Sequence, residues 1–353
     1  MAKAFDLTLW ARPEMLALAP YTSARDTFTA TEGNYNFLDA NENPNPSTFN
    51  RYPDPNQLAL KKKIAALRSC SVDQLLIGNG SDEILDLIFR AFCTPNKDNV
   101  IIMPPTYGMY AVLAKINSVG IKEVPLAAYF QLNTEKILST VSPNTKAIFF
   151  CSPNNPSGNL FKRSDIKQLL NNFDGVVVID EAYIDFTDEP SWLTQSDSYP
   201  NLMITQTLSK AFGLAGLRLG IAIGHPSIIK LLHNIKPPYN INTLSQQKAI
   251  ESLTDIEKVD KQIKELLTER RRVAAYLSEL KWVETVFPSD ANFLLVRVDD
   301  ANKRYEALLT RKVVVRNRTT QTNCENCLRI TIGTPKENNQ LIDCLLYTSD
   351  AAD

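Results

Sequence analysis

The stretch TLSKAFGLAGLRLG, from Thr207 to Gly220, is the most informative part of this chain. It places Lys210 among small and apolar residues, directly after the apolar segment NLMITQ. Such neighbours withdraw water from a lysine, so we expect the pKa of its amine to fall and some free amine to exist near neutral pH. A free amine attacks carbonyl groups to form a Schiff base. Ser209 beside it and Arg218 further on are donors that suit a phosphate.

A small molecule that carries both a carbonyl and a phosphate is pyridoxal 5′-phosphate (PLP). The segment around Lys210 therefore predicts PLP as the cofactor. The alternative interpretation is an ordinary surface lysine after a buried strand, because most lysines are solvated.

A second segment, VVVIDEAYIDF, favours the cofactor. Its four consecutive β-branched residues predict a strand that is buried on both faces and ends at Asp180. Open α/β sheets bind ligands at the C-terminal ends of such strands, and an acid there can keep the ring nitrogen of PLP protonated. Tyr183, three residues on, can donate to the phenolic oxygen of the ring. The alternative for Asp180 is a helix-cap aspartate.

Weaker candidates follow other expected strands. The glycine turn GNGSDE opens a helix at which the backbone near Ser81 and Asp82 can bind an anion. Tyr107, in PPTYGMY, can stack on a flat ring, and the amide of Asn155, in SPNNPSG, can donate to the phenolic oxygen. Each has an ordinary structural alternative, but all are expected at one edge of the same sheet.

Composition narrows the class of protein. The chain has 353 residues, 44% of them hydrophobic, and a formal net charge of -1. The length favours about two domains, and the charge argues against nucleic-acid and membrane surfaces. No apolar run reaches the roughly 18 residues of a membrane span, and the first residues do not resemble a signal peptide. We therefore expect a cytoplasmic protein.

The six cysteines and two histidines do not predict a metal site. Cys324 and Cys327 form a CxxC, but a zinc site needs two further ligands and a redox motif needs a thioredoxin-like context. His225 and His233 lack metal-ligand spacing. We expect free thiols and no metal.

Short apolar strands that alternate with helices predict a mostly parallel sheet with right-handed crossovers. Helices are expected over 57–68 and after the GNGSDE turn, where Ser81 or Asp82 would cap the helix. Residues 248–280 look like one long charged helix that leads into a smaller domain. That domain has the strands ANFLLVRV and CLRITIG, with a helix over 303–310 between them.

The order GNGSDE, PPTYGMY, CSPNNPSG, VVVIDEAYIDF, TLSKAFGLAGLRLG resembles the PLP-dependent aminotransferases of fold type I. The resemblance extends from about Arg12 to Asp343 and implies a large α/β domain with a mostly parallel sheet and a smaller α/β domain. Within the family, PYTSAR, LDANENPNP, RYPDP and KPPYNIN are similar to the members that act on histidinol phosphate, with glutamate and 2-oxoglutarate as the other substrate pair.

The resemblance also implies roles for single residues. Lys210 would hold PLP and transfer the substrate proton, with Asp180 and Tyr183 as the other catalytic residues. The residues implied to bind the cofactor are Ser81, Asp82, Tyr107, Asn155, Asp180, Tyr183, Thr207, Ser209, Lys210 and Arg218, with Tyr52 from the neighbouring subunit of a homodimer. Those implied to bind the substrate are Tyr21, Asn43, Tyr239, Arg316 and Arg329. For Arg316 the alternative is open, because Arg318 would share its face in an extended segment.

The implied organisation has four parts: an N-terminal arm (1–50) that packs with the small domain, a large PLP-binding domain (51–250), a small domain (251–343) and a tail (344–353). The tail, CLLYTSDAAD, resembles a translated sequencing adapter, so we expect a non-native segment without a packing role.

Two alternatives to the main functional prediction remain. The first is a related enzyme of the same fold that acts on aromatic amino acids, aspartate or threonine phosphate. The segments PYTSAR and KPPYNIN favour histidinol phosphate over these substrates. The second is a ligand sensor in a transcription regulator, which would carry a basic DNA-binding module that this sequence lacks.

Overall fold

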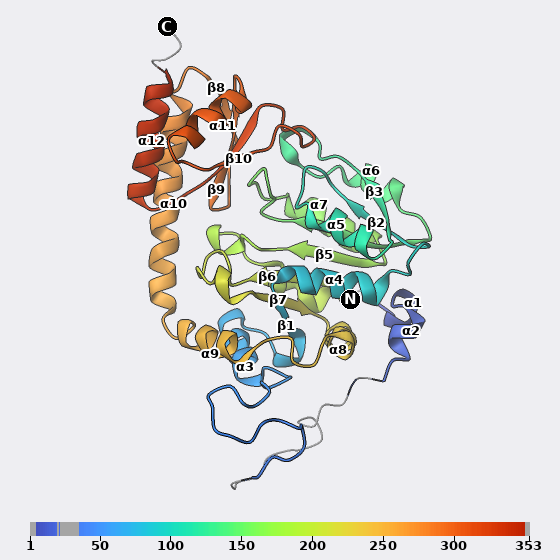
Figure 1. Cartoon of the computed structure of the whole chain (residues 1–353). Helices are drawn as coiled ribbons and strands as arrows, with labels where there is room; N and C mark the ends of the chain where they lie inside the picture. The colour runs from blue at the N-terminus through green and yellow to red at the C-terminus, as the bar shows by residue number, and fades with distance from the viewer. Residues whose placement is uncertain (1–4, 20, 22–34, 350–353) are drawn as a thin grey trace.

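The computed structural model describes residues 5–19, 21 and 35–349, and it contains two sheets that belong to two domains (Figure 1). The large sheet has seven strands in the order β1-β7-β6-β5-β4-β2-β3. Their bounds are β1 (Leu75–Asn79), β2 (Asn99–Ile102), β3 (Gly120–Glu123), β4 (Thr145–Cys151), β5 (Val176–Asp180), β6 (Leu202–Thr207) and β7 (Leu219–Gly224).

The pairs β3–β2, β2–β4, β4–β5 and β5–β6 are parallel, whereas β7 is antiparallel to both of its neighbours. The expected mostly parallel α/β sheet is thus confirmed. The exception at β7 has a local reason. Parallel neighbours need a crossover connection, usually a helix, but the segment 208–218 turns back directly beside β6.

Helices cover both faces of this sheet (Figure 1). They are α3 (Leu58–Arg68), α4 (Ser81–Phe92), α5 (Met109–Ile116), α6 (Thr134–Thr140), α7 (Arg163–Asn172), α8 (Pro226–Ile235) and α9 (Thr243–Ser252). Strand β4 contributes Ile148 and Phe150 to the core on one face and Phe149 to the core on the other. Because successive side chains of a strand alternate, a strand that is buried on both faces is apolar throughout.

The small domain is built on the antiparallel sheet β10-β11-β9-β8. Its elements are α10 (Ile256–Ser278), β8 (Val283–Val286), β9 (Phe293–Val298), α11 (Ala301–Thr310), β10 (Arg316–Asn317), β11 (Cys327–Thr331) and α12 (Pro335–Ser349). Both expected strands and the helix between them are confirmed. None of the described helices combines the length and apolar character that crossing a membrane requires.

The expected single helix over 248–280 was wrong, because α9 ends at Ser252 and α10 begins at Ile256. The break is a new helix start. Asp255 is the N-cap of α10, and its side chain accepts a hydrogen bond from the backbone N–H of Lys258. From this start α10 runs from the large domain into the small one (Figure 1).

The expected packing of the N-terminal arm was wrong for its first described residues. The short helices α1 (Leu7–Trp10) and α2 (Pro13–Leu16) lie against the large domain, far from the small one (Figure 1). The backbone N–H of Arg12 donates to the carbonyl of Ala91 at the end of α4, at 2.8 Å. Trp10 packs edge-on against Phe173, with ring centroids 6.0 Å apart. The apolar residues of α1 thus extend a core that the large sheet already has.

The expected absence of packing in the tail was also wrong at its beginning. Helix α12 continues without a break to Ser349, and its first tail residues are buried in the small-domain core, Cys344 with 7% and Leu345 with 2% exposure. They follow Leu341 at helical spacing, so the same helix face continues into the core.

This burial gives a stability test. We expect Leu345→Ala to lower the free energy of unfolding by about 2–4 kcal/mol, because it leaves a cavity in the core. The matched control is Leu309→Ala on α11, where the side chain is 41% exposed and the loss should stay below about 1 kcal/mol. Urea unfolding of both variants checks this. Equal losses would contradict a packing role for residue 345.

Candidate active site at the C-terminal edge of the large sheet

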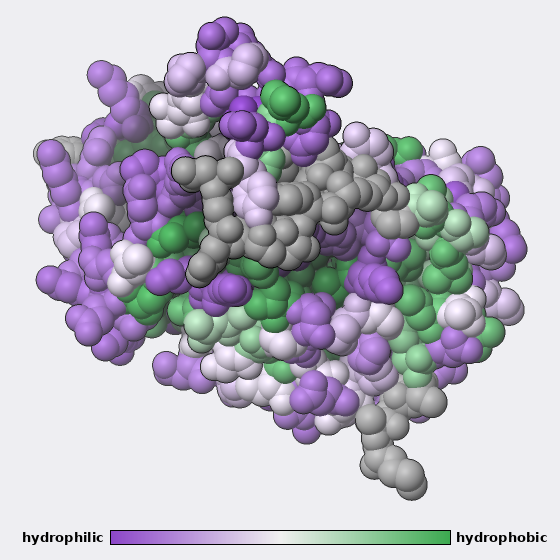
Figure 2. Space-filling model, turned by 90° about the horizontal axis from the view of Figure 1, so that it is seen from below, coloured by the Kyte–Doolittle hydropathy of each residue, from purple (hydrophilic) through white to green (hydrophobic). Residues whose placement is uncertain are grey.

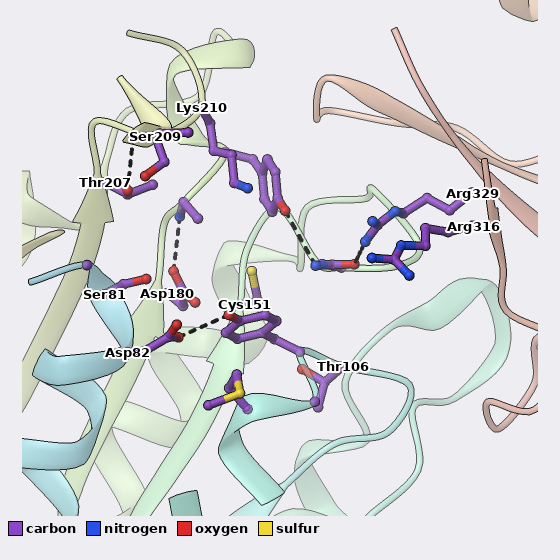
Figure 3. Close-up of a pocket in the computed structure, with 18 of the residues that line it drawn as sticks. Ser81, Asp82, Thr106, Cys151, Asp180, Thr207, Ser209, Lys210, Arg316 and Arg329 are labelled. Atoms are coloured by element: carbon purple, nitrogen blue, oxygen red, sulfur yellow. Dashed lines mark hydrogen bonds between the residues drawn. The ribbon is translucent and has the colours of Figure 1, made fainter. Parts of the chain in front are cut away.

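A cavity of about 520 Å³ lies at the C-terminal edge of the parallel strands, where the small domain faces the large one (Figures 1 and 3). It brings together most of the residues that the sequence singled out. Those that line it are Ser81, Asp82, Tyr107, Asn155, Asp180, Tyr183, Thr207, Ser209, Lys210, Arg218, Arg316 and Arg329. The large domain contributes all of them except the last two arginines, which the small sheet contributes.

Asp180 ends strand β5 and is buried at the floor of this cavity. The hydroxyl of Tyr110 donates to its Oδ2, and the backbone N–H of Ala182 donates to its Oδ1, both at 3.1 Å. Burial raises the pKa of Asp180 to about 6, and these hydrogen bonds oppose the rise. The result is a fixed carboxylate that carries a negative charge at neutral pH.

Lys210 follows β6 and extends into the open cavity (Figure 3). Its Nζ lies 5.8 Å from the centroid of the Tyr183 ring. Partial burial, together with the positive charges of Arg329 and Arg218, lowers the pKa of its amine. A lowered pKa of Lys210 is what its small and apolar neighbours in the sequence predict.

The phosphate-binding end is formed where β7 approaches the N-terminus of α4. An added Cβ on Gly220 would collide with the backbone N of Ser81, and one on Gly80 would lie 2.7 Å from Nη2 of Arg218. Gly80 also has a φ of +81°, which favours glycine. Only glycine at both positions lets the start of α4, its dipole and the Arg218 guanidinium meet at one point.

The expected cap of α4 was wrong. Gly80 is the N-cap and no side chain caps the helix, while Ser81 is the first helical residue. Glu83 reaches back instead and accepts a hydrogen bond from the backbone N–H of Asn79 at 2.5 Å. The carboxylate of Asp82 accepts a hydrogen bond from the hydroxyl of Tyr107 at 3.0 Å. Ser81 is thus free of a capping role and lines the cavity.

A hydrogen-bonded chain joins the two domains across the cavity. The amide of Asn155 donates to the Tyr183 hydroxyl at 3.4 Å, and its carbonyl oxygen accepts from Nη1 of Arg329 at 2.5 Å (Figure 3). Burial raises the pKa of Tyr183, which therefore stays protonated at neutral pH. Arg329 lies opposite Arg316 in the register of β11 and β10, so both guanidinium groups reach the same end of the cavity.

Four predicted residues do not line this cavity. Tyr21 is 71% exposed, and Asn43 forms hydrogen bonds with Asn45 in its own loop. Tyr52 stacks on Tyr239, with ring centroids 4.5 Å apart, and both line a separate cavity. The PYTSAR stretch lies outside the described residues apart from Tyr21.

The sequence analysis missed Tyr110, and it named Arg318 only as a residue that would share the face of Arg316. Tyr110 is fully buried and meets Tyr107 edge-on, with ring centroids 5.6 Å apart, so it contacts a cavity-lining tyrosine as well as Asp180. The i, i+3 spacing of these tyrosines at a helix start was the available signal. Arg318 lines the cavity together with Arg316 and Arg329.

Comparisons with known proteins agree with this geometry. Residues 32–345 match the family described as Aminotransferase class I and II. The histidinol-phosphate aminotransferase of Flavobacterium johnsoniae is 54% identical over 339 residues, which cover 96% of this chain and 97% of the relative. That of Christiangramia forsetii is 51% identical over 340 residues, with 96% and 97% covered. The crystal structure of the histidinol-phosphate aminotransferase from Clostridium acetobutylicum has a TM-score of 0.79 and 26% identity, over 85% of this chain and 91% of that one.

The raised pKa of Asp180 predicts a pH-dependent stability of the cofactor-free protein. Its pKa is about 6 when folded and 3.8 in the reference state, so the folded protein binds more protons between these values. Stability should therefore fall as the pH rises from about 4 to about 6, by about 3 kcal/mol in total. Asp180→Asn should lack this fall.

Urea unfolding at pH 4, 5, 6 and 7 measures the difference between the two proteins. The difference in the free energy of unfolding between wild type and Asp180→Asn should change up to about pH 6 and stay constant above that pH. Asp197→Asn, on the exposed surface, is the control of the same type. A difference that is constant over this range would contradict the buried position of Asp180.

Proposed function

The chain belongs to the aminotransferase class I and II family, and on that premise we propose that it interconverts histidinol phosphate and 2-oxoglutarate with imidazole acetol phosphate and glutamate, a step of histidine biosynthesis. The enzyme depends on PLP, and its substrates are small molecules. Similarity to curated relatives over nearly their whole length supports the proposal. The observation that carries it is a single cavity in which a lysine of lowered pKa lies between a buried carboxylate and a group of arginines.

The donors and acceptors around this cavity fit PLP. The uncapped N-terminus of α4 and the tight approach at Gly80 and Gly220 suit a phosphate, and the buried Asp180 suits a protonated ring nitrogen. The phosphate would be held by Ser81, the backbone of Asp82, Thr207, Ser209 and Arg218. Tyr107 would stack on the ring, while Asn155 and Tyr183 would donate to the phenolic oxygen.

When bound, PLP supplies a ring that accepts the electrons left behind when the substrate loses its Cα proton. Asp180 would hold a negative charge beside the ring nitrogen, which would favour that transfer of charge. Lys210 would both anchor the cofactor and act as the base, with its Nζ taking and returning the substrate proton. Its lowered pKa keeps more of the amine free for this role. Tyr183, kept protonated by burial, donates and does not compete as a base.

The substrates need an anion site at the opposite end of the cavity. Arg329 would bind the phosphate of histidinol phosphate and the carboxylate of glutamate in turn, with Arg316 beside it. A guanidinium presents a fork of donors that matches either anion. The hydrogen bond from Arg329 to Asn155 supports this, because it fixes the guanidinium next to the ring-binding residues.

We also propose a homodimer in which Tyr52 reaches the cofactor phosphate of the neighbouring subunit. Tyr52 is 52% exposed, and Phe49, Leu58 and Leu244 near it in the fold expose large apolar side chains as well. Hydrophobic residues gather on the lower face of the molecule, seen in Figure 2. Exposed apolar surface of this kind is typical of an interface. Tyr21, Asn43 and Tyr239 would complete the substrate pocket across it. The expected cytoplasmic location remains a prediction.

A coupled assay tests the reaction. We expect turnover of histidinol phosphate with 2-oxoglutarate to exceed that of phenylalanine, aspartate or threonine phosphate by at least about a hundredfold in kcat/KM, because only histidinol phosphate offers both the imidazole and the phosphate. Lys210→Ala should abolish turnover and leave the protein unable to retain PLP after borohydride reduction. A preference for phenylalanine, or carbon dioxide release from threonine phosphate, would support the alternative enzymes instead.

Mixed dimers test the role of Tyr52. Tyr52→Ala and Lys210→Ala should each be nearly inactive alone. In a mixed dimer, one site would combine the intact Lys210 of one subunit with the intact Tyr52 of the other, so co-expression should restore about one quarter of wild-type activity. If Tyr52 served its own subunit, every site would carry a substitution and activity would stay at the level of the parents.

A further inference from the structure

We propose that Arg318 is a specificity-determining residue of the substrate site, whose guanidinium makes the cavity prefer a dianionic phosphate to a singly charged carboxylate. The inference rests on the proposed function, since it assigns the phosphate of that substrate to a group of three arginines and not to the pair Arg316 and Arg329 alone.

The position of Arg318 places it at the anion end of the cavity. Its backbone N–H donates to the carbonyl of Cys327 at 2.8 Å, so the chain after β10 is held against β11. Its side chain lines the same cavity as Arg316 and Arg329, and its charge acts on Tyr183. Arg316 is exposed, whereas Arg318 is half-buried. Arg318 is therefore the more enclosed of the two arginines.

Arg318 also has hydrogen-bonding capacity that this part of the protein does not use. The Nε groups of Arg318 and Arg329 are buried and have no hydrogen-bond partner in the described part of the chain. The same holds for Oε1 of Gln321, another residue of the cavity wall. A buried donor without a partner destabilises the folded protein. Arg318 and Arg329 also line the cavity, so a ligand there can accept hydrogen bonds from the guanidinium N–H groups that face it.

The charges point to the kind of ligand. Burial, and then the positive charges of neighbouring arginines, lower the pKa values of Arg318 and Arg329. The fold thus holds the positive charges of these arginines close together although they repel one another. Among the described residues, no carboxylate forms an ion pair with any of the three arginines. The carboxylates in the cavity wall, Asp82 and Asp180, are bonded to tyrosines. An anion relieves this repulsion, and a dianion relieves it more than a monoanion.

The two proposed substrates differ in this property. A phosphate ester has a second pKa near 6, carries close to two charges at neutral pH and offers three acceptor oxygens. Glutamate has two separate carboxylates, and the one that binds at this end of the cavity carries one charge and two oxygens, which one forked guanidinium satisfies. A third arginine is therefore surplus for glutamate and useful for histidinol phosphate.

The test uses the holoenzyme, in which PLP already fills the cofactor phosphate site. We expect Arg318→Gln to lower kcat/KM for histidinol phosphate at least about tenfold and that for glutamate less than about threefold, because a charge-assisted contact is lost to the phosphate alone. Arg318→Lys keeps the charge without the fork and should lie in between. Arg271→Gln removes one charge from an exposed position of α10 and should leave both values unchanged.

Two further readouts separate binding from a structural role. Inorganic phosphate should bind at least about tenfold more weakly to Arg318→Gln than to wild type. Its affinity can be measured from competitive inhibition and from the rise that it causes in the melting temperature of the holoenzyme. The kcat/KM for histidinol phosphate should rise through about pH 6 in wild type, as the dianion forms, and less steeply in the variant.

Equal losses with both substrates, or unchanged affinity for inorganic phosphate, would overturn the assignment of Arg318. If wild-type enzyme did not turn over histidinol phosphate, the proposed function would fail. The inorganic phosphate titration of the two holoenzymes would then still decide whether Arg318 binds a phosphate.

Discussion

The close approach of strand β7 to the first turn of helix α4 is the constraint on which the site depends. Gly220 pairs with Gly78 across the β1–β7 ladder, and its Cα faces the backbone of Ser81 so closely that no side chain fits between them. This contact places the free backbone groups at the start of α4 beside Arg218, and it fixes the end of the segment that carries Lys210. Packing at two glycines thus determines where an anion and an amine can meet.

Charge is distributed along the cavity in a simple order. Carboxylates that are hydrogen-bonded to tyrosines lie on the large-domain wall together with Arg218, three further arginines lie on the small-domain wall, and Lys210 lies between them. Burial is the main cause of the lowered pKa of Lys210; Arg329 and Arg218 lower this pKa further, whereas Asp180 raises it. The large domain alone would present an acid, a lysine and a phosphate-binding turn, but no second anion site. The hydrogen bond between Asn155 and Arg329 is where the two halves become one site.

Much of this was predictable because it is encoded locally. A run of β-branched residues that ends in an acid, and a lysine between small residues, each specify their own surroundings, so Asp180 and Lys210 were correctly expected near one another. What the sequence did not predict depends on partners far away in the chain. Asn155 and Arg329, which share a hydrogen bond, are 174 residues apart. Tyr110 belongs to the site through its hydrogen bond to Asp180. The burial of Leu345 depends on a core that other elements build. The cap of α4 was misassigned because serine and aspartate usually cap helices, whereas here the backbone at Gly80 must stay bare.

The reversed direction of β7 has a consequence for the lysine. Thr207 and Gly220 face each other in the register of neighbouring antiparallel strands, so the residues between them form a short closed loop with both ends anchored. The conformational entropy of that loop is lost when the sheet forms, long before a substrate arrives. Lys210 is thus tethered, and its amine acts at a high effective concentration at one spot of the cavity. A crossover helix in its place would have carried the chain away from the sheet edge, and the amine with it.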